Sequence, residues 1–464
     1  MKIFNTLTKE KQEFVPIKEG EVKIYACGPT VYNYIHIGNA RPICVFDVLR
    51  RYLEYRGYNV TFVQNFTDID DKIIKRANEE GTDFVTVSEK YIEEFWKDAK
   101  GLNFREATIH PKATENIDKI IEIVSGLIDN GHAYAVDGDV YFSPKTFDEY
   151  GKLSHQPLEE LEAGARIMVG DIKKDPMDFA LWKAAKPGEP YWESPWGKGR
   201  PGWHIECSAM VCRYLGESID IHCGGQDLIF PHHENEIAQS ECFTGKPFAN
   251  YWMHNGYINV DNVKMSKSLG NFKTVRDVAA VYGYEPIRYL MISSSYRSPI
   301  NYSIDIIEQC KAALSRLYTC RDSIDFEIKN NNIDGDVSAE IKVQLDSRVN
   351  QFVEAMDDDL NTADGISAVF ELVRDINTLV IGKEESKATA EYAAKIFDEL
   401  TGVLGLVYNR KTETLDEDID AMIAARTQAR KDKNWAEADR IRDELKAMGI
   451  VLEDTAQGVK WHRE

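Results

Sequence analysis

The sequence lacks any long apolar segment. No uninterrupted apolar run reaches roughly 18 residues, the length expected of a membrane-spanning helix. The first fourteen residues, MKIFNTLTKEKQEF, carry charge before an apolar run forms, so we expect neither a signal peptide nor a membrane anchor. The sequence therefore predicts a cytoplasmic protein without a membrane partner.

Closely spaced cysteine pairs are also missing. The eight cysteines occupy positions 27, 44, 207, 212, 223, 242, 310 and 320, at irregular spacing and without a C-x-x-C motif. Such a pattern in a long chain favours reduced thiols over a disulfide framework. Most of these thiols are then expected to be buried small hydrophobes, with a few free to bind a metal.

Basic residues are in deficit. The chain has 56 lysines and arginines against 77 acidic residues, and its formal net charge is −21. A uniformly acidic protein would repel nucleic acid, which is bound through clustered basic side chains. Screening nevertheless confines charge effects to about 8 Å, and the segment after residue 420 is close to neutral. A confined basic path that binds one folded RNA therefore stays open.

The amino-terminal part predicts a parallel sheet. A short apolar run at 22–26 ends at Cys27-Gly28-Pro29, and a helical stripe over 41–55 leads to a second strand at 59–64. Strands joined in this way form a βαβ unit, whose ligands lie beyond the carboxyl ends of the strands. Cys27 and Thr67 are therefore expected on one rim. Further strands are predicted at 204–209, 219–223 and 257–260.

Several domains are expected from 464 residues. The expected fold class is α/β: a split Rossmann-like parallel-sheet domain, an inserted α/β subdomain, a helical bundle and a small C-terminal α+β domain. Asp137-Gly138 predicts a hairpin within the insertion, and 411–420 resembles an acidic linker. The expected boundaries are 1–110 and 201–300 for the catalytic halves, 111–200 for the insertion, 301–410 for the bundle and 420–464 for the last domain.

Two short motifs carry the chemistry. His36-Ile37-Gly38-Asn39 lies where a helix begins, and free backbone N–H groups together with the helix dipole favour an anion there. KMSKS follows far downstream at 264–268. In this order the two motifs resemble the HIGH and KMSKS signatures of class I aminoacyl-tRNA synthetases. Asn39 replaces the second histidine of HIGH, and asparagine can donate a hydrogen bond but cannot carry charge.

Longer strings narrow the resemblance to the cysteinyl-tRNA synthetase family. They are CGPTVYNYIHIGNAR at 27–41, FTDIDDKII at 66–74, GWHIECSAM at 202–210, GGQDLIFPHHENEIAQ at 224–239 and MDDDLNTADG at 356–365. The resemblance extends over essentially the whole chain. It implies a cysteine–tRNA ligase that activates L-cysteine with ATP and transfers it to the 3′ end of tRNA(Cys), and we expect a monomer.

A metal site is weighed against buried thiols. His232 and Glu236 are spaced i, i+4 on one helix face, and Cys27 and Cys207 are both placed at the ends of predicted strands. This spacing is compatible with a metal site and also with buried thiols that bind no metal. The resemblance implies that these four residues bind one zinc ion. Zinc would select the substrate thiolate over the hydroxyl of serine, whereas an apolar pocket separates such near-isosteres by only about 10- to 200-fold.

The resemblance also implies the nucleotide and substrate contacts. Stabilisation of the reacting phosphates of ATP, bound with Mg²⁺, is assigned to His36, Gly38, Asn39, Lys264 and Lys267. Gly225 and Asp227 are expected near the ribose. The expected cysteine contacts are Cys27, Gly28, Thr67 and Trp203, although Trp203 also suits a core position.

Two rival functions remain at this point. A ligase could pass cysteine from the adenylate to a small-molecule amine, since such enzymes share the catalytic core. A zinc-stabilised RNA-binding protein without catalysis is the other rival, but it would be expected to have lost His36 or Lys267. In the C-terminal region, basic residues on two predicted helices suit an anticodon, while Trp435 is expected in the seam between those helices.

Overall fold

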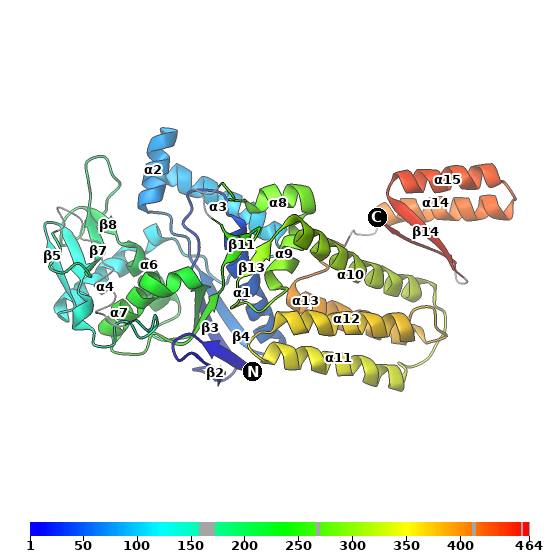
Figure 1. Cartoon of the computed structure of the whole chain (residues 1–464), viewed down its shortest axis with the longest axis horizontal. Coiled ribbons are helices and arrows are strands. Elements are labelled where there is room, and N and C mark those ends of the chain that lie inside the picture. Colours follow the sequence, from blue (N-terminus) through cyan, green and yellow to red (C-terminus); the bar gives the residue numbers. More distant parts are fainter. Residues whose placement is uncertain (157–171, 266–269, 411–413, 456–457, 464) are drawn as a thin grey trace. The chain divides into compact units, whose positions relative to one another are not determined.

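The computed structural model describes residues 1–156, 172–265, 270–410, 414–455 and 458–463. The chain divides into two compact units (Figure 1). The first unit contains Met1–Ile307 and Met356–Thr362, and the second contains Glu308–Ala355 and Ala363–Glu464. Every helix within the described segments is too short or too polar to cross a bilayer.

A four-stranded parallel sheet forms the centre of the first unit. Its order is β10 (Ala249–Asn255), β9 (Ile219–Gly225), β3 (Glu21–Ala26) and β4 (Asn59–Gln64). The strands are rich in buried apolar residues because helices cover both faces of such a sheet. Strand order reverses between β3 and β9, and in open α/β sheets ligands bind at this switch point, beyond the carboxyl ends of the strands.

Eight α-helices in the described part of the first unit lie within Ile37–Ile292, and each buries apolar side chains. They are α1 (Ile37–Tyr55), α2 (Asp71–Glu80), α3 (Phe84–Gly101), α4 (Ile117–Asp129), α6 (Trp203–Tyr214), α7 (Glu234–Thr244), α8 (Val275–Tyr282) and α9 (Tyr284–Ile292). Helix α1 leads from β3 to β4 and completes the expected βαβ unit. Its amino end therefore lies beside the carboxyl end of β3.

Three smaller sheets complete the first unit. Antiparallel strands β5 (Ala133–Val136), β6 (Asp139–Phe142), β7 (Phe179–Ala184) and β8 (Gly199–Pro201) form one of them, with the predicted hairpin at Asp137-Gly138. It packs on α4, α6 and α7 through Ile120, Phe142 and Trp182. The others contain β1 (Lys2–Asn5) with β2 (Glu10–Glu13), and β12 (Val263–Lys264), β11 (Ile258–Val260) and β13 (Ile300–Tyr302).

The prediction of a strand over 204–209 is wrong. These residues form the first turns of α6, which begins after Gly202. The segment is buried on nearly every side, and in a short run of this kind periodicity does not distinguish a buried strand from a buried helix. Cys207 therefore projects from a helix and not from the end of a strand.

The second unit is mainly helical. Its helices are α10 (Ile304–Asn330), α11 (Ala339–Asp357), α12 (Thr362–Leu379), α13 (Lys387–Leu404), α14 (Thr414–Lys431) and α15 (Trp435–Ala447), followed by the hairpin of β14 (Ile450–Thr455) and β15 (Gly458–Arg463). Arg321 of α10 forms two hydrogen bonds with Asp398 of α13, at 2.7 and 2.9 Å. Arg348 of α11 binds Asp375 of α12 at 2.7 Å.

Two details of the C-terminal region differ from expectation. The predicted linker at 411–420 is helical from Thr414, because Ile419 and Ile423 pack against Ile441 and Leu445 of α15. The tryptophan at the start of α15 does not fill the seam between the helices. Trp435 is 59% exposed, and aliphatic side chains fill that seam instead.

A buried ionic group joins α1 to α9. Asp47 and Arg288 are fully buried, and the Asp47 carboxylate accepts hydrogen bonds from Arg288 at 2.6 Å and Arg51 at 2.7 Å. Burial by itself raises the pKa of Asp47, but the two guanidinium groups more than reverse this effect, so its pKa lies below the ordinary value. The carboxylate is thus ionised in the folded protein over the neutral range.

Replacing this carboxylate should destabilise the first unit. Asp47→Asn removes the carboxylate that pairs with the buried Arg288. Breaking a buried ion pair in this way typically costs about 3–5 kcal/mol of unfolding free energy. Because the folded pKa of Asp47 is lowered, its contribution is fully present above the unfolded value of about 3.9 and is lost as pH falls through the folded pKa. Urea denaturation at pH 7 and at pH 3.5 should show the wild-type advantage narrowing at the lower pH. An equal advantage at both would contradict the assignment.

Candidate metal and nucleotide site

The predicted site residues gather at the carboxyl ends of the parallel strands. Ala26 is in register with Gln64 of β4 and Cys223 of β9, so the residues that follow these strands share one rim. Cys27 continues β3, Thr67 lies shortly after β4, and Gly225 ends β9. The expectation that Cys27 and Thr67 lie on one rim is consistent with this register.

Four donor atoms of the predicted metal set converge beside β3. The sulfur atoms of Cys27 and Cys207 are 3.8 Å apart, and both thiols are free. His232 Nε2 lies 3.6 Å from Cys207 Sγ and 2.9 Å from Glu236 Oε1, which in turn is 3.5 Å from Cys27 Sγ. One ligand atom from each of the four residues lies within 4.8 Å of the others.

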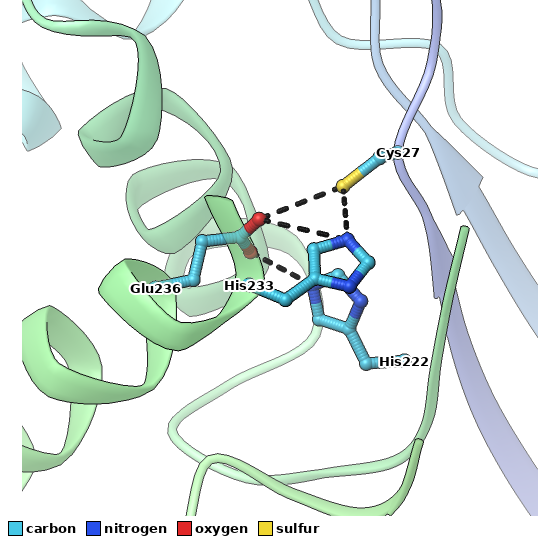
Figure 2. A group of neighbouring side chains, drawn as sticks. All are labelled: Cys27, His222, His233 and Glu236. Atoms are coloured by element: carbon cyan, nitrogen blue, oxygen red, sulfur yellow. Dashed lines mark hydrogen bonds and ion pairs between the residues drawn. The ribbon is translucent and has the colours of Figure 1, made fainter. Parts of the chain in front are cut away.

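A second, overlapping donor set uses two other histidines. Cys27, His222, His233 and Glu236 also bring their ligand atoms within 4.8 Å of one another, as Figure 2 shows. His233 Nε2 is 3.2 Å from Cys27 Sγ, and His222 Nε2 is 2.8 Å from Glu236 Oε2. The two carboxylate oxygens therefore face different histidines: Oε1 faces His232, and Oε2 faces His222.

Burial and charge set the protonation of this cluster. Burial raises the pKa of Glu236, but His222 and His232 outweigh it and hold the carboxyl ionised. The thiol of Cys27 has a raised pKa because it is desolvated, whereas the hydrogen bond from Cys27 lowers the pKa of Cys207 to about 6. One thiolate and one carboxylate are thus favoured together in a mostly buried cluster.

An outer layer orients these donors. His233 Nδ1 is 2.8 Å from His254 Nε2, and His254 Nδ1 is 2.8 Å from Thr6 Oγ1. The ring of His232 stacks on Trp203 at 4.3 Å between centroids, while His222 stacks on Trp252 at 4.5 Å. Contacts of this kind fix the ring orientation and tautomer of a metal-binding histidine.

The donor chemistry fits a zinc ion. Two thiols, an imidazole nitrogen and a carboxylate are the ligand types that zinc takes in four-coordinate sites. The chain supplies them within one buried cluster, and no disulfide joins the two sulfurs. A buried phenol adjoins the cluster: Tyr25 is fully buried, and the nearby Cys207 and Cys27 add to the effect of burial in raising its pKa.

A hydroxyl and a close backbone turn lie next to the metal cluster. Thr67 is buried and donates a hydrogen bond to Glu206 Oε2 at 2.9 Å. Gly28 N donates to Asn65 Oδ1 at 2.8 Å, and a Cβ at Gly28 would collide with the Asn65 carbonyl oxygen. Only glycine allows β3 and β4 to approach so closely at this rim. Trp203, the other predicted substrate contact, is 40% exposed beside His232.

The first signature motif forms the amino end of α1. His36 is the N-cap residue, and its backbone N–H donates to Asn39 Oδ1 at 3.1 Å. Asn39 thus closes a reciprocal cap on the helix, which gives its amide a local role that the sequence did not reveal. Gly38 leaves room for the tip of Met265, which would lie 3.2 Å from a Cβ at this position. The start of the second motif therefore approaches the first.

The structure describes the remaining predicted residues in part. Lys264 is exposed on β12, with its Nζ 4.9 Å from the centroid of the Tyr257 ring. Gly225 adjoins the exposed Asp227, whose carboxylate would meet a Cβ at Gly225. Lys267 lies outside the described residues. The nucleotide assignments therefore stay predictions. Gly225 ends β9 and Cys27 directly follows β3, so the two residues lie at the carboxyl ends of neighbouring strands.

Sequence reasoning missed four histidines around the metal cluster. His204, His222, His233 and His254 come from four separate elements, and their spacing matches no metal motif. One signal was present, because His233 adjoins His232 in the HHENE string. Adjacent residues on a regular helix point about 100° apart, so the pair suggested one ligand and one neighbour rather than two donors that both reach the same carboxylate.

Comparison with known proteins identifies relatives along the whole chain. A family model described as the tRNA synthetases class I (C) catalytic domain matches residues 13–312, a DALR domain matches 351–408, and a cysteinyl-tRNA ligase anticodon binding domain matches 412–461. The chain is 57% identical to a cysteine–tRNA ligase of Clostridioides difficile (strain 630) and 55% identical to one of Caldicellulosiruptor saccharolyticus. Each alignment covers all of both proteins.

A solved structure supports the fold. Mycobacterium tuberculosis methionyl-tRNA synthetase in complex with methionyl-adenylate aligns with a TM-score of 0.64 at 14% sequence identity. The alignment covers 84% of this chain and 92% of the other. Sequence identity at this level supports a shared fold and nothing narrower. The α/β class with a parallel sheet, predicted from the sequence, is confirmed.

Metal binding should distinguish the two donor sets. We expect one zinc per chain, held by the set with two thiols, because zinc favours thiolate ligands and His222 already bonds Glu236. His222→Ala should then lower zinc affinity by the roughly 10- to 100-fold typical of an outer-layer partner, and His232→Ala by more. Chelator competition measures both, with Cys223→Ala as a buried-thiol control outside either set.

Cobalt substitution gives an independent count of the sulfur ligands. The sulfur-to-cobalt absorption of the wild-type protein should be roughly halved in Cys207→Ala, since one of two thiolates is lost. A spectrum that Cys207→Ala leaves unchanged, or a larger affinity loss for His222→Ala than for His232→Ala, would assign the metal to the other set.

Proposed function

Because the chain belongs to the class I cysteine–tRNA ligase family, we propose that it joins L-cysteine to tRNA(Cys) in two steps. An oxygen of the cysteine carboxylate attacks the α-phosphorus of ATP, and pyrophosphate leaves. The terminal hydroxyl of the tRNA then attacks the carbonyl carbon of cysteinyl-adenylate, and AMP leaves. The observation that carries the proposal is the thiol-rich donor cluster placed at the switch point of the sheet.

Selection of cysteine is assigned to the metal cluster. A zinc ion bound there would lower the pKa of the substrate thiol and bind its thiolate, for which a serine hydroxyl is a poor substitute. We propose Cys27, Cys207, His232 and Glu236 as its ligands. Their burial supports this role, because a closed site with little water strengthens the electrostatic difference between sulfur and oxygen.

The rest of the amino acid is assigned to the neighbouring rim. Trp203 stacks on His232 and offers a flat apolar surface for the side chain of the substrate. The Thr67 hydroxyl donates a hydrogen bond to Glu206 and accepts a long one, at 3.4 Å, from Asn65 Nδ2, so one of its lone pairs would be available to the α-ammonium group. Gly28 keeps the backbone of β3 close enough to contact the same substrate.

The nucleotide is assigned to the amino end of α1. Its helix dipole and the side chains of His36 and Asn39 would stabilise the phosphates, since adenylation depends on positioning and on stabilising negative charge. Gly38 permits close approach of the phosphate chain, and Lys264 and Lys267 would neutralise the departing pyrophosphate. Gly225 and Asp227 are proposed for the ribose, and Mg²⁺ would accompany ATP.

The domain roles are proposals as well. Residues 1–110 and 201–300 would form the catalytic domain, 111–200 the insertion, 301–410 the bundle and 420–464 the anticodon-binding domain. The start of α14 at Thr414 supports an earlier boundary for the last of these regions. We propose a monomer that acts in the cytoplasm, where charged tRNA is used.

The outward position of Trp435 favours tRNA as the acceptor. An exposed tryptophan is a surface on which an unpaired base can stack, and Lys431 and Lys433 beside it can bind phosphates. A ligase acting on a small-molecule amine has no use for such a surface. The C-terminal region that carries Trp435 therefore distinguishes tRNA from a small-molecule amine as the acceptor.

Replacing Lys267, the second lysine of KMSKS, should lower the rate of adenylation and leave cysteine affinity nearly unchanged. Lys267→Ala is expected to reduce cysteine-dependent ATP–pyrophosphate exchange by about 10²- to 10³-fold, because the lysine meets charge that develops in the transition state. Cysteine affinity should stay within twofold. Lys246→Ala, at an exposed lysine paired with Glu217, is the matched control. A parallel fall in cysteine affinity would remove the assigned role.

Removal of the C-terminal region should separate activation from charging. A protein that ends at Arg410 avoids cutting α14, which a cut at Asp420 would sever. It should retain pyrophosphate exchange and lose most charging of tRNA(Cys), since the adenylation residues lie far upstream. Charging at the full-length rate would contradict anticodon reading by this region and favour the small-molecule acceptor.

A further inference from the structure

Arg41 is a buried cation close to the proposed nucleotide site. It lies on α1 four residues after Ile37, about 6 Å along the helix axis. Its side chain is fully buried, and burial lowers its pKa to about 10, so the guanidinium remains charged at neutral pH. No carboxylate in the described part of the chain lies within ion-pair distance of it.

Backbone carbonyl groups take the place of a counter-ion. Nη1 of Arg41 donates to the carbonyl oxygens of Gly256 and Tyr257, and Nη2 donates to that of Ser295, each at 3.0 Å. Burying a charge without an opposite charge is costly, and an apolar side chain of similar size often serves stability as well or better. The value of Arg41 to the protein therefore lies in the segments that these three hydrogen bonds hold in place.

The three acceptors lie where a small sheet begins. Gly256 and Tyr257 directly precede β11, and Ser295 lies shortly before β13. Strands β11 and β13 pair in parallel from Ile258 and Ile300, and β12, which carries Lys264, pairs with β11. Arg41 thus fastens the root of the β11–β12 hairpin to α1.

Tyr257 extends this connection to the signature lysine. Its carbonyl oxygen accepts the bond from Arg41, and its partly exposed ring lies 4.9 Å from Lys264 Nζ. A cation over an aromatic face at this distance is attracted to it. The ring therefore restricts an otherwise exposed lysine side chain.

The far end of the same segment is fastened to α1 as well. Lys273 O accepts from Ile37 N at 3.1 Å, and Ile35 O accepts from Val275 N at 3.0 Å. Between these anchors the tip of Met265 approaches Gly38. The position of the hairpin relative to the amino end of α1 is therefore set by Arg41 on one side and by a backbone ladder on the other.

We propose that Arg41 and Tyr257 are positioning residues for the adenylation step described above. Arg41 sets the root of the β11–β12 hairpin relative to the His36–Asn39 turn. Tyr257 holds Lys264 on that hairpin. A triphosphate bound at α1 then meets a lysine that is already in place, which avoids reorganisation during the reaction. The inference rests on the proposed function.

Steady-state pyrophosphate exchange tests the proposal. Arg41→Lys keeps the charge but cannot reach three carbonyl groups in one plane, and Tyr257→Leu removes the ring while keeping the backbone acceptor. Each should lower kcat by about 10- to 100-fold, the effect expected of a misplaced catalytic group. The KM for cysteine and the zinc content should change less than twofold, since the metal cluster is not involved. Tyr257→Phe should recover most of the kcat that Tyr257→Leu loses.

Arg288 provides the matched control for a purely structural arginine. It is equally buried and also binds α1, through Asp47, and it donates a further hydrogen bond to the carbonyl oxygen of Leu102, at the end of α3, at 2.9 Å. Arg288→Lys should lower Tm as Arg41→Lys does, without the selective fall in kcat. If Arg41→Lys keeps its kcat, or loses kcat and cysteine affinity together, the positioning role is overturned while the proposed function stands. A wild-type protein without cysteine-dependent exchange would overturn both.

Discussion

The parallel pairing of β3 with β4 and β9 is the constraint on which the sites depend. Each strand ends at the same level, so residues that follow three separate strands meet at one rim. A one-residue shift in register would turn every side chain of a strand to the opposite face and separate Cys27 from Glu236. Gly28 permits the closest approach at this rim, because any side chain would strike the backbone of Asn65.

Charge inside this framework is managed in two different ways. Around Asp47 the protein pairs a carboxylate with two arginines, and the group stabilises the contact of α1 with α9. Around Glu236 the partners are histidines and thiols, whose charge depends on protonation and which can also bind a metal. The first arrangement stabilises the folded state. The second provides a soft, mostly buried donor set of the kind that a zinc ion takes.

The amino end of α1 connects the two signature motifs to this metal cluster. It follows β3, which leads into Cys27, and it is bonded to the segments on both sides of the second motif. A substrate thiol held by the cluster and a triphosphate held at the helix would therefore be positioned by the same short stretch of chain. Arg41 lies at this junction, bonded to three carbonyl groups. The positioning role proposed for it would account for a buried cation here, despite the free-energy cost of burying a charge.

Much of the fold followed from local patterns. The βαβ unit, the hairpin at Asp137-Gly138 and the helical second unit were predicted because their apolar periodicity and turn residues are local properties. The predictions failed where burial on all sides erased the pattern, as over 204–209, or where a helix was stabilised by a distant partner, as from Thr414. The fold class and the family could thus be read from the sequence.

The residue types and order of the metal ligands were also available from the sequence, through their resemblance to a family. The sequence did not reveal that a second donor set overlaps with the first. His222, His233 and Glu236 come together only when β9 and α7 pack against each other. The sequence likewise did not reveal the role of Glu234, which accepts hydrogen bonds from backbone N–H groups of 151–154. Side-chain identity depends on the sequence alone, whereas the direction each side chain faces and the atoms it meets depend on long-range packing, which only the tertiary structure decides.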